Sequence, residues 1–189
     1  MKAGVLALQG DFREHARAFA DAGATPIEVR TAAQLADVDV LAIPGGESTT
    51  IGKLARAYDL VEPIRERARL GMPILGTCAG MIVLAEQVIG GQPLLGLIDI
   101  TVRRNAYGRQ VDSFEADVEV EGIEQPVRGV FIRAPRVERV GPGVHVLGTY
   151  EGHPVVLEHA NLLVASFHPE LVGHTGLHRY LLAKLNEVA

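Results

Sequence analysis

The chain has 189 residues, of which 48% are hydrophobic and 22% are charged, and its formal net charge is −5. This composition excludes a disordered chain, and the acidic balance argues against a nucleic-acid or anionic-membrane surface, which normally carries a basic patch. A single cysteine excludes an internal disulfide. No apolar run approaches the roughly 18 residues of a membrane helix. We therefore expect one cytoplasmic domain over residues 1–189, with no nucleic-acid or membrane partner.

Short apolar runs alternate with helical patterns along most of the chain. The runs suit strands buried on both faces of a parallel sheet, and they cover Ala3–Leu8, Ile27–Arg30, Val38–Ile43, Met72–Gly76 and Asn161–Phe167. The helical patterns cover Asp11–Ala22, with Phe12, Ala16 and Phe19 inward, and then Thr49–Ala57, Ala79–Val88 and Gly176–Val188. This order predicts an α/β fold in which a doubly wound, flavodoxin-like, mostly parallel sheet is flanked by helices.

The pattern changes between Leu97 and about Tyr150. Polar and apolar residues alternate there, and glycine and proline punctuate the segments Ile98–Val102, Phe114–Val120 and Val130–Ile132. This pattern predicts an antiparallel insertion in the middle of the fold.

Three of the buried runs end in segments with chemically useful residues. These segments are Pro44–Thr50 (PGGESTT), Gly76–Gly80 (GTCAG) and His168–Glu170 (HPE). Ligands of an open parallel sheet bind outside the carboxyl ends of its strands, so we expect the three segments to converge on one site.

The segment around Cys78 has the glycine–x–nucleophile–x–glycine form of a strand-to-helix elbow, with cysteine at the nucleophile position. Side chains at Gly76 and Gly80 would collide in so sharp a turn, and the N-terminus of the following helix favours a thiolate. The competing interpretation is a buried core cysteine beside a glycine turn.

His168 and Glu170 follow the last buried strand. An imidazole there can take the proton of the thiol and return it to a leaving amine while a carboxylate orients the ring, if Pro169 bends the chain. The alternative is a pair of ordinary loop residues. We expect the other six histidines to lie at the surface: His15, His145, His153, His159, His174 and His178. His174 and His178 have an i, i+4 spacing that could suit a metal, but a third ligand is missing.

The turn Pro44–Thr50 precedes a helix, and its amides, with the amide of Ala79, can stabilise an oxyanion. A phosphate cradle competes with this interpretation, but Gly52-Lys53 is followed by Leu54, so the full P-loop pattern is absent. A purely structural turn is the third reading. We expect neither a metal nor a cofactor.

With these residues the chain resembles the glutaminase subunits of pyridoxal 5′-phosphate synthases, a family of class I, triad-type glutamine amidotransferases. The resemblance spans nearly the whole chain. Its segments are Gly4–Gly10 with Arg13-Glu14-His15, Pro44–Thr50, Gly76–Gly80, Arg104–Ala116 (RNAYGRQVDSFEA), Gly129–Pro135 (GVFIRAP) and Ser166–Glu170 (SFHPE). The GGESTT, RQVDSFEA and FIRAP stretches point to this family among the class I amidotransferases.

The resemblance implies a role for each matching residue. Cys78 would be the nucleophile, and His168 and Glu170 would complete the triad. The backbone amides of Gly46 and Ala79 would form the oxyanion hole. Glutamine would be held by Gly46, Glu47, Ser48, Arg104, Ile132 and Arg133. An arginine suits the substrate carboxylate, and Glu47 suits the α-ammonium or the amide, although the sequence leaves their individual roles open.

The implied activity is hydrolysis of L-glutamine to L-glutamate and ammonia through a γ-glutamyl thioester. The implied partner is a synthase subunit that takes up the ammonia in a hetero-oligomer and makes pyridoxal 5′-phosphate, in vitamin B6 biosynthesis. In such pairs the glutaminase matures on docking, so we expect an incomplete oxyanion hole in the isolated chain, through a flipped peptide near Gly45-Gly46. The turn Gln9-Gly10-Asp11 lies at the same predicted sheet edge and would touch the partner or the site.

Three other functions compete with this one. The glutaminase of imidazole glycerol phosphate synthase shares the triad and is separated only by the family segments. A cysteine hydrolase or peptidase would use the same elbow on other substrates. A non-catalytic binding module would keep the fold but would not need Cys78, His168 and Glu170 together.

Overall fold

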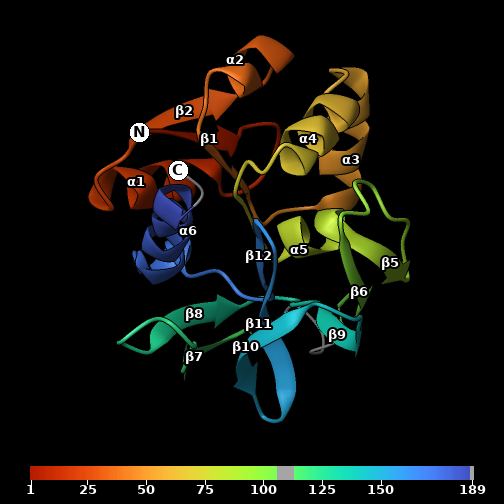
Figure 1. Ribbon diagram of the computed structural model, residues 1–189. Helices are drawn as coiled ribbons and strands as arrows, with labels where there is room; N and C mark the ends of the chain where they lie inside the picture. The colour runs from red at the N-terminus through yellow and green to blue at the C-terminus, as the bar shows by residue number, and fades with distance from the viewer. Residues whose placement is uncertain (106–112, 188–189) are drawn as a thin grey trace.

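The computed structural model describes residues 1–105 and 113–187, and a seven-stranded sheet runs through its middle (Figure 1). Five neighbouring strands are parallel, and a hairpin adds two antiparallel strands at one edge. In spatial order the strands are β2 (Thr25–Val29), β1 (Lys2–Leu6), β3 (Val40–Ile43), β4 (Ile74–Thr77), β12 (Leu162–Ala165), β11 (His153–His159) and β10 (His145–Tyr150). The predicted doubly wound, mostly parallel sheet is thus confirmed.

Helices cover both faces of this sheet. One face carries α1 (Phe12–Asp21) and α6 (Gly176–Glu187), and the other carries α3 (Ser48–Ala57), α4 (Val61–Arg69) and α5 (Ala79–Leu84) (Figure 1). Successive side chains of a strand point to opposite faces. Leu41 and Ile43 of β3 therefore pack in the core beneath α3, α4 and α5, whereas Val40 and Ala42 pack with α1 and α6.

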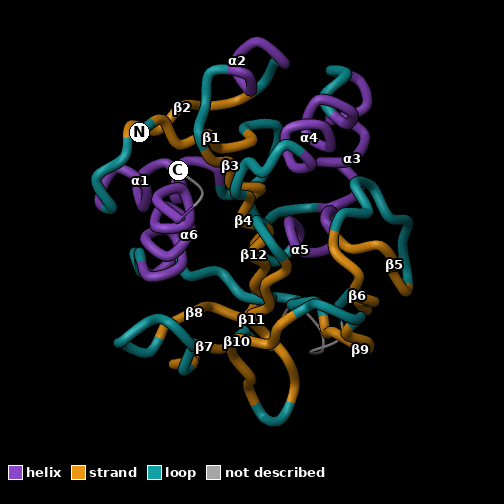
Figure 2. The backbone as a smooth tube through the Cα atoms, viewed as in Figure 1, coloured by secondary structure: helices purple, strands orange, loops and turns teal. Residues whose placement is uncertain are grey.

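Two smaller sheets form the predicted insertion, which Figure 2 shows below and beside the main sheet. One is the antiparallel hairpin of β7 (Phe114–Val118) and β8 (Val127–Phe131). The other combines β5 (Ala85–Ile89), β6 (Ile98–Arg103) and β9 (Arg136–Val140), with β6 antiparallel to β9 but parallel to β5. Residues 106–112, which include the RQVD part of the RQVDSFEA stretch, lie outside the described residues.

The prediction of a helix over Ala79–Val88 is wrong in its second half. The observed helix α5 ends at Leu84, and Ala85–Ile89 forms β5. The chain returns at Leu95 and Leu97, whose amides donate to the carbonyls of Val83 and Leu84. These two bonds satisfy the carbonyl groups of the last turn of the helix, which have no partner within the helix. Pairing with β6 then holds the residues after Leu84 in an extended conformation.

The structure adds two helices that the patterns above did not predict. Helix α2 (Ala32–Ala36) begins with a capping box between Thr31 and Gln34, and α4 buries Ile64 and Ala68 on one face. A short 3-10 turn, η1, covers Glu170–Val172. None of the described helices is long and apolar enough to cross a membrane.

Candidate active site

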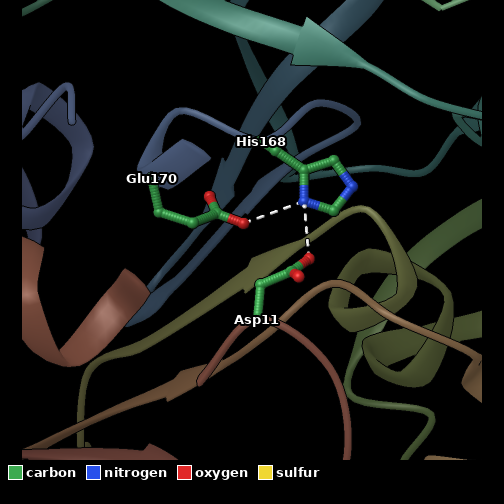
Figure 3. A group of neighbouring side chains, drawn as sticks. All are labelled: Asp11, His168 and Glu170. Atoms are coloured by element: carbon green, nitrogen blue, oxygen red, sulfur yellow. Dashed lines mark hydrogen bonds and ion pairs between the residues drawn. The ribbon is translucent and has the colours of Figure 1, made fainter. Parts of the chain in front are cut away.

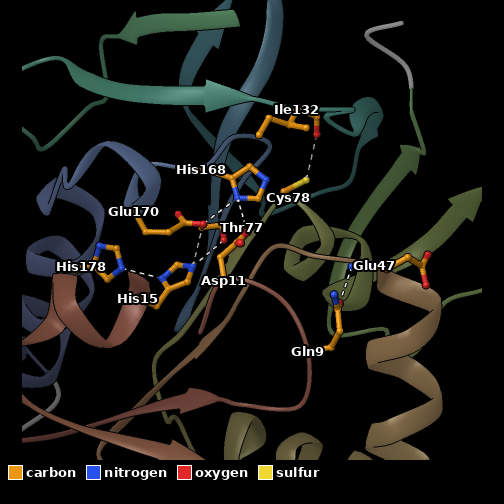
Figure 4. A network of polar contacts seen from close by, with 10 residues as sticks. All are labelled: Gln9, Asp11, His15, Glu47, Thr77, Cys78, Ile132, His168, Glu170 and His178. Atoms are coloured by element: carbon orange, nitrogen blue, oxygen red, sulfur yellow. Dashed lines mark hydrogen bonds and ion pairs between the residues drawn. The ribbon is translucent and has the colours of Figure 1, made fainter. Parts of the chain in front are cut away.

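The three predicted segments meet at the carboxyl ends of β3, β4 and β12. A cavity of about 290 Å³ opens there. It is lined by Gln9, Asp11, Gly46, Glu47, Ser48, Cys78, Ala79, Ile82, Arg104, Asn105, Ile132, Arg133, His168 and Leu171. Every predicted catalytic, oxyanion-hole and glutamine-binding residue lines this cavity, except Glu170, which lies behind His168 (Figure 4).

Cys78 occupies a strained turn between β4 and α5, with φ 48° and ψ −102°. A positive φ is costly for a residue with a side chain, and it is what an elbow requires. A Cβ atom on Gly80 would lie 2.1 Å from the carbonyl oxygen of Ile43, and one on Gly76 would lie 2.7 Å from the backbone of Gly80. The two glycines are therefore needed for the reason that the sequence suggested.

Cys78 is almost fully buried, with 6% of the residue exposed. Its backbone amide donates to the carbonyl of Ala165 at 2.8 Å, which ties the elbow to β12. Its Sγ atom lies 3.8 Å from the carbonyl oxygen of Ile132, within hydrogen-bonding range for sulfur. The elbow thus places the thiol between β12 and the FIRAP segment.

His168 is held by its backbone and by its ring. Its amide and carbonyl form a pair of hydrogen bonds with Val130 of β8. A Cβ atom on Gly45 would lie 2.0 Å from the ring carbon Cε1, so only glycine at position 45 lets the ring stand where it does. The predicted turn Pro44–Thr50 therefore contributes to the site through the room that it leaves for the imidazole.

Pro169 adopts a helical conformation (φ −73°, ψ −29°) and turns the chain so that Glu170 faces back toward His168. The Nδ1 atom of His168 lies 2.8 Å from Oε1 of Glu170 and 3.3 Å from Oδ2 of Asp11 (Figure 3). The imidazole–carboxylate contact that depended on a bend at Pro169 is present.

Electrostatics favour a charged pair at this position. Burial disfavours the imidazolium form of His168, but hydrogen bonds with Asp11, Cys78 and Glu170 outweigh burial and raise the pKa of His168 well above its usual value. Burial alone would raise the pKa of Glu170, yet its interactions with His15 and His168 hold that pKa far below the usual range. Glu170 is therefore an ionised carboxylate beneath a readily protonated imidazole.

The outer part of the cavity combines charges of both signs. Nη2 of Arg104 lies 2.9 Å from Oε1 of Glu47, while Oε2 of Glu47 accepts the amide of Thr50 and caps α3. Burial acts to raise the pKa of Glu47, but hydrogen bonds from Thr50 and Thr49 lower it overall. Arg133 takes a left-handed conformation (φ 44°) at the rim. The cavity that holds Cys78 is thus also lined by positive and negative side chains.

The turn Gln9-Gly10-Asp11 touches the site, as its place at the sheet edge suggested. Oε1 of Gln9 accepts the amide of Glu47 at 2.7 Å, and the amide of Asp11 donates to the carbonyl of Gly45 at 3.1 Å. A Cβ atom on Gly10 would lie 1.8 Å from that carbonyl oxygen. The β1–α1 turn therefore packs directly on the PGGES turn.

Sequence reasoning missed a buried polar cluster behind Glu170. The prediction that His15 and His178 lie at the surface is wrong, since each is fully buried. His15 is buried with Ala18 and Phe19 on one face of α1, whereas Phe12 and Ala16 are only partly buried. The i, i+4 relation of His15 to Phe19 was the available signal.

A metal could in principle use Asp11, His168 and Glu170, because one ligand atom of each lies within 4.8 Å of the others. A proton on Nδ1 of His168, shared with the two carboxylates, explains the same geometry. His174 and His178 have different partners, since Nδ1 of His174 accepts the amide of Gly176 and His178 contacts His15. That the site works without a metal stays a prediction.

Fold and site together define an α/β protein with a cysteine elbow and a histidine–carboxylate pair at one sheet edge, the arrangement of cysteine-dependent amide hydrolases. The chain belongs to the SNO glutamine amidotransferase family, which matches residues 5–187. The family resemblance inferred from the motifs is confirmed, and the chain is an enzyme of the amidotransferase class.

Curated relatives match along almost their whole length. A Frankia alni protein named pyridoxal 5′-phosphate synthase subunit PdxT is 56% identical over 180 residues, covering 93% of this chain and 90% of the relative. The Desulforudis audaxviator protein of the same name is 55% identical over 184 residues, covering 96% of this chain and 97% of the relative.

Solved structures agree with this assignment. One described as a glutamine amidotransferase superposes with a TM-score of 0.92 at 49% identity and covers 97% of this chain and 98% of that chain. A chain in the PurLQS structure from Thermotoga maritima has a TM-score of 0.75 at 19% identity, covers 100% of this chain and 98% of that one, and supports the fold alone.

Proposed function

We propose that this chain is the glutaminase subunit of a pyridoxal 5′-phosphate synthase, which hydrolyses L-glutamine and passes ammonia to a synthase subunit. The observation that carries the proposal is the placement of Cys78 and His168 in one cavity with Arg104 and Glu47. The names of relatives that are more than half identical over nearly the whole chain supply the pathway.

In the proposed reaction, the thiolate of Cys78 attacks the side-chain amide carbon of glutamine. The imidazolium of His168 gives its proton to the departing nitrogen, which leaves as ammonia, and a γ-glutamyl thioester remains on the sulfur. Water then attacks the thioester while His168 takes up its proton, and glutamate is released. Glu170 holds the imidazole in position and stabilises its charge throughout.

The charges at the rim suit the amino-acid end of glutamine. Arg104 or Arg133 would bind the α-carboxylate, and Glu47 would bind the α-ammonium group. Gly46, Ser48 and Ile132 would complete the binding surface. Backbone amides of Gly46 and Ala79 would bind the oxyanion that forms when the thiolate attacks.

The isolated subunit is proposed to be a poor glutaminase that matures on docking. The carbonyl of Gly45 is held by the amide of Asp11, so the orientation of the Gly45–Gly46 peptide depends on the β1–α1 turn. A partner that moves this turn would reorient the amide of Gly46. We place the complex in the cytoplasm, as a hetero-oligomer without nucleic-acid or membrane contacts.

The test is ammonia and glutamate release from glutamine with and without the cognate synthase, with Cys78→Ala as the inactive control. We expect turnover that rises strongly when the synthase is added and disappears in the variant. Full activity without the synthase would contradict maturation on docking, and cleavage of peptides without glutaminase activity would contradict the function itself.

A further inference from the structure

A column of buried polar side chains stands behind Glu170, on the side away from the cavity (Figure 4). Nε2 of His15 lies 2.9 Å from Oγ1 of Thr77 and 3.4 Å from Oε1 of Glu170, and Nδ1 of His15 lies 2.8 Å from Nε2 of His178. The two histidines are 163 residues apart in the chain and come from α1 and α6. Both are fully buried, and neither lines the cavity.

The hydrogen-bond partners assign the protons of the column. Burial lowers the pKa of His178 to about 3, so His178 is neutral and carries one proton. Its Nδ1 atom is buried and has no partner among the described residues. A buried N–H without an acceptor is rare in proteins, so the proton sits on Nε2 and is donated to His15.

This assignment fixes the role of His15 as a donor toward the candidate triad. Since Nδ1 of His15 accepts the proton of His178, its own proton is on Nε2, which faces Thr77 and Glu170. Oε1 of Glu170 then faces two N–H groups, that of His168 at 2.8 Å and that of His15 at 3.4 Å. The N–H of His15 is shared with the nearer Oγ1 of Thr77, at 2.9 Å. Oε2 of Glu170 is buried without a partner in the described part of the chain, so these donors decide how the carboxylate is oriented.

We propose that His15 is a positioning residue, which donates its Nε2 proton to Glu170 and holds that carboxylate against His168. His178 acts one step further back by holding His15 in the donating tautomer. The rings of Phe19 and His178 pack edge to face, with ring centroids 4.9 Å apart and planes at 88°. This inference rests on the proposed function, because it assigns Glu170 to a working triad.

Two substitutions of His15 separate its two nitrogen atoms. The amide group of a glutamine reaches about as far as Nε2 of a histidine, whereas that of an asparagine reaches about as far as Nδ1. His15→Gln therefore keeps a donor for Glu170 and Thr77 and loses the bond to His178. His15→Asn keeps a partner for His178 and leaves Glu170 with His168 alone. His145→Asn, at an exposed position on β10, is the matched control.

Glutamine turnover with the synthase is the first measurement. We expect His15→Asn to lower kcat about 10- to 100-fold with little change in KM, since orienting partners of catalytic groups have effects of this size. His15→Gln should recover most of kcat, and His145→Asn should match wild type. Equal losses in the two His15 variants, each tracking a loss of thermal stability, would overturn the proposal in favour of a merely structural role.

The pH profile of kcat/KM adds a second readout. The groups that face His168 are Asp11, Cys78 and Glu170. A poorly oriented Glu170 stabilises the imidazolium less, so the alkaline limb of activity should move to lower pH in His15→Asn and stay in place in His15→Gln. An unmoved limb in His15→Asn would contradict the proposal.

Alkylation of Cys78 by iodoacetamide keeps this inference separate from the proposed function, because it needs no glutamine. At neutral pH we expect slower alkylation in His15→Asn than in His15→Gln, because fewer molecules hold the thiolate–imidazolium pair. If wild type lacks glutaminase activity but this order holds, the proposed function fails and the positioning role stands. If His15→Asn does not fold, His178→Asn and His178→Gln provide the same comparison. We expect faster alkylation of Cys78 in His178→Gln than in His178→Asn. Equal alkylation rates in these two variants would contradict the positioning role.

Discussion

The ring of His168 and the carboxylate of Glu170 are joined at 2.8 Å although only Pro169 separates them in the chain. Side chains two residues apart on an extended strand point to the same face, and their Cα atoms lie about 6.6 Å apart. The helical conformation of Pro169 and the short turn that follows it shorten this distance. The contact between His168 and Glu170 therefore depends on β12 ending at Ala165, before the chain turns at Pro169.

Glu170→Gln should keep the shape of the pair and remove its charge. An amide that presents N–H to Nδ1 favours the wrong imidazole tautomer and no longer stabilises the imidazolium. We expect kcat to fall about 10³- to 10⁴-fold, as for the equivalent change in serine–histidine–aspartate hydrolases. Steady-state glutaminase assays with the synthase measure this effect. Glu62→Gln, at an exposed residue of α4, is the control, and a loss below tenfold would argue that Glu170 is only structural.

Arg104 is expected to act on binding more than on chemistry. Replacement by glutamine removes the charge beside Glu47, and KM for glutamine should rise about 10- to 100-fold with little change in kcat. Arg103→Gln is a matched control, since the neighbouring side chain pairs with Glu138 and does not line the cavity. Equal KM values for the two variants would exclude Arg104 from substrate binding.

Gly80→Ala tests the tightness of the elbow. The new methyl group would lie 2.1 Å from the carbonyl oxygen of Ile43, so backbone must move, and the free energy of unfolding should fall by about 1–3 kcal/mol. Glutaminase activity should be lost with it. Gly52→Ala, within α3, meets only ordinary contacts beyond 3.4 Å and should be stabilising by about 0.5–1 kcal/mol. Denaturant unfolding of both variants checks the contrast, and equal stabilities would contradict it.

His178 should make the folded state sensitive to mild acid. Its pKa is about 3 in the folded protein and near 6.5 in the unfolded chain, so between these values the unfolded state binds more protons. Stability from this residue is complete above the unfolded pKa and falls as the pH drops through the window. Between about pH 7.5 and about pH 5 the loss is about 2 kcal/mol.

Denaturant unfolding at the two pH values compares wild type with His178→Gln, which cannot titrate. The raised pKa of His168 contributes stability below its unfolded pKa and loses it as pH rises, which is the opposite sign. That contribution is present in both proteins, so the difference between them isolates His178. An identical pH dependence in the two proteins would show that His178 is accessible to protons in the folded state.

The sequence alone predicted the architecture and the candidate site, because both depend on local patterns. Buried runs of four to seven residues followed by glycine-rich turns are typical of parallel strands, and the carboxyl ends of such strands meet at one edge. The glycines beside Cys78 indicated a turn in which no side chain fits. Motif resemblance then connected Arg104 and Ile132 to the same site, which spacing could not do.

Tertiary structure decided what depends on contacts between distant segments. The last residues of the predicted helix Ala79–Val88 form a strand, because the returning chain at Leu95–Leu97 caps the helix and β6 pairs with Ala85–Ile89. His15 and His178 are polar residues that a sequence pattern places at the surface. They are buried because α1 and α6 pack side by side on one face of the sheet, where each imidazole is the hydrogen-bond partner that makes burial of the other tolerable.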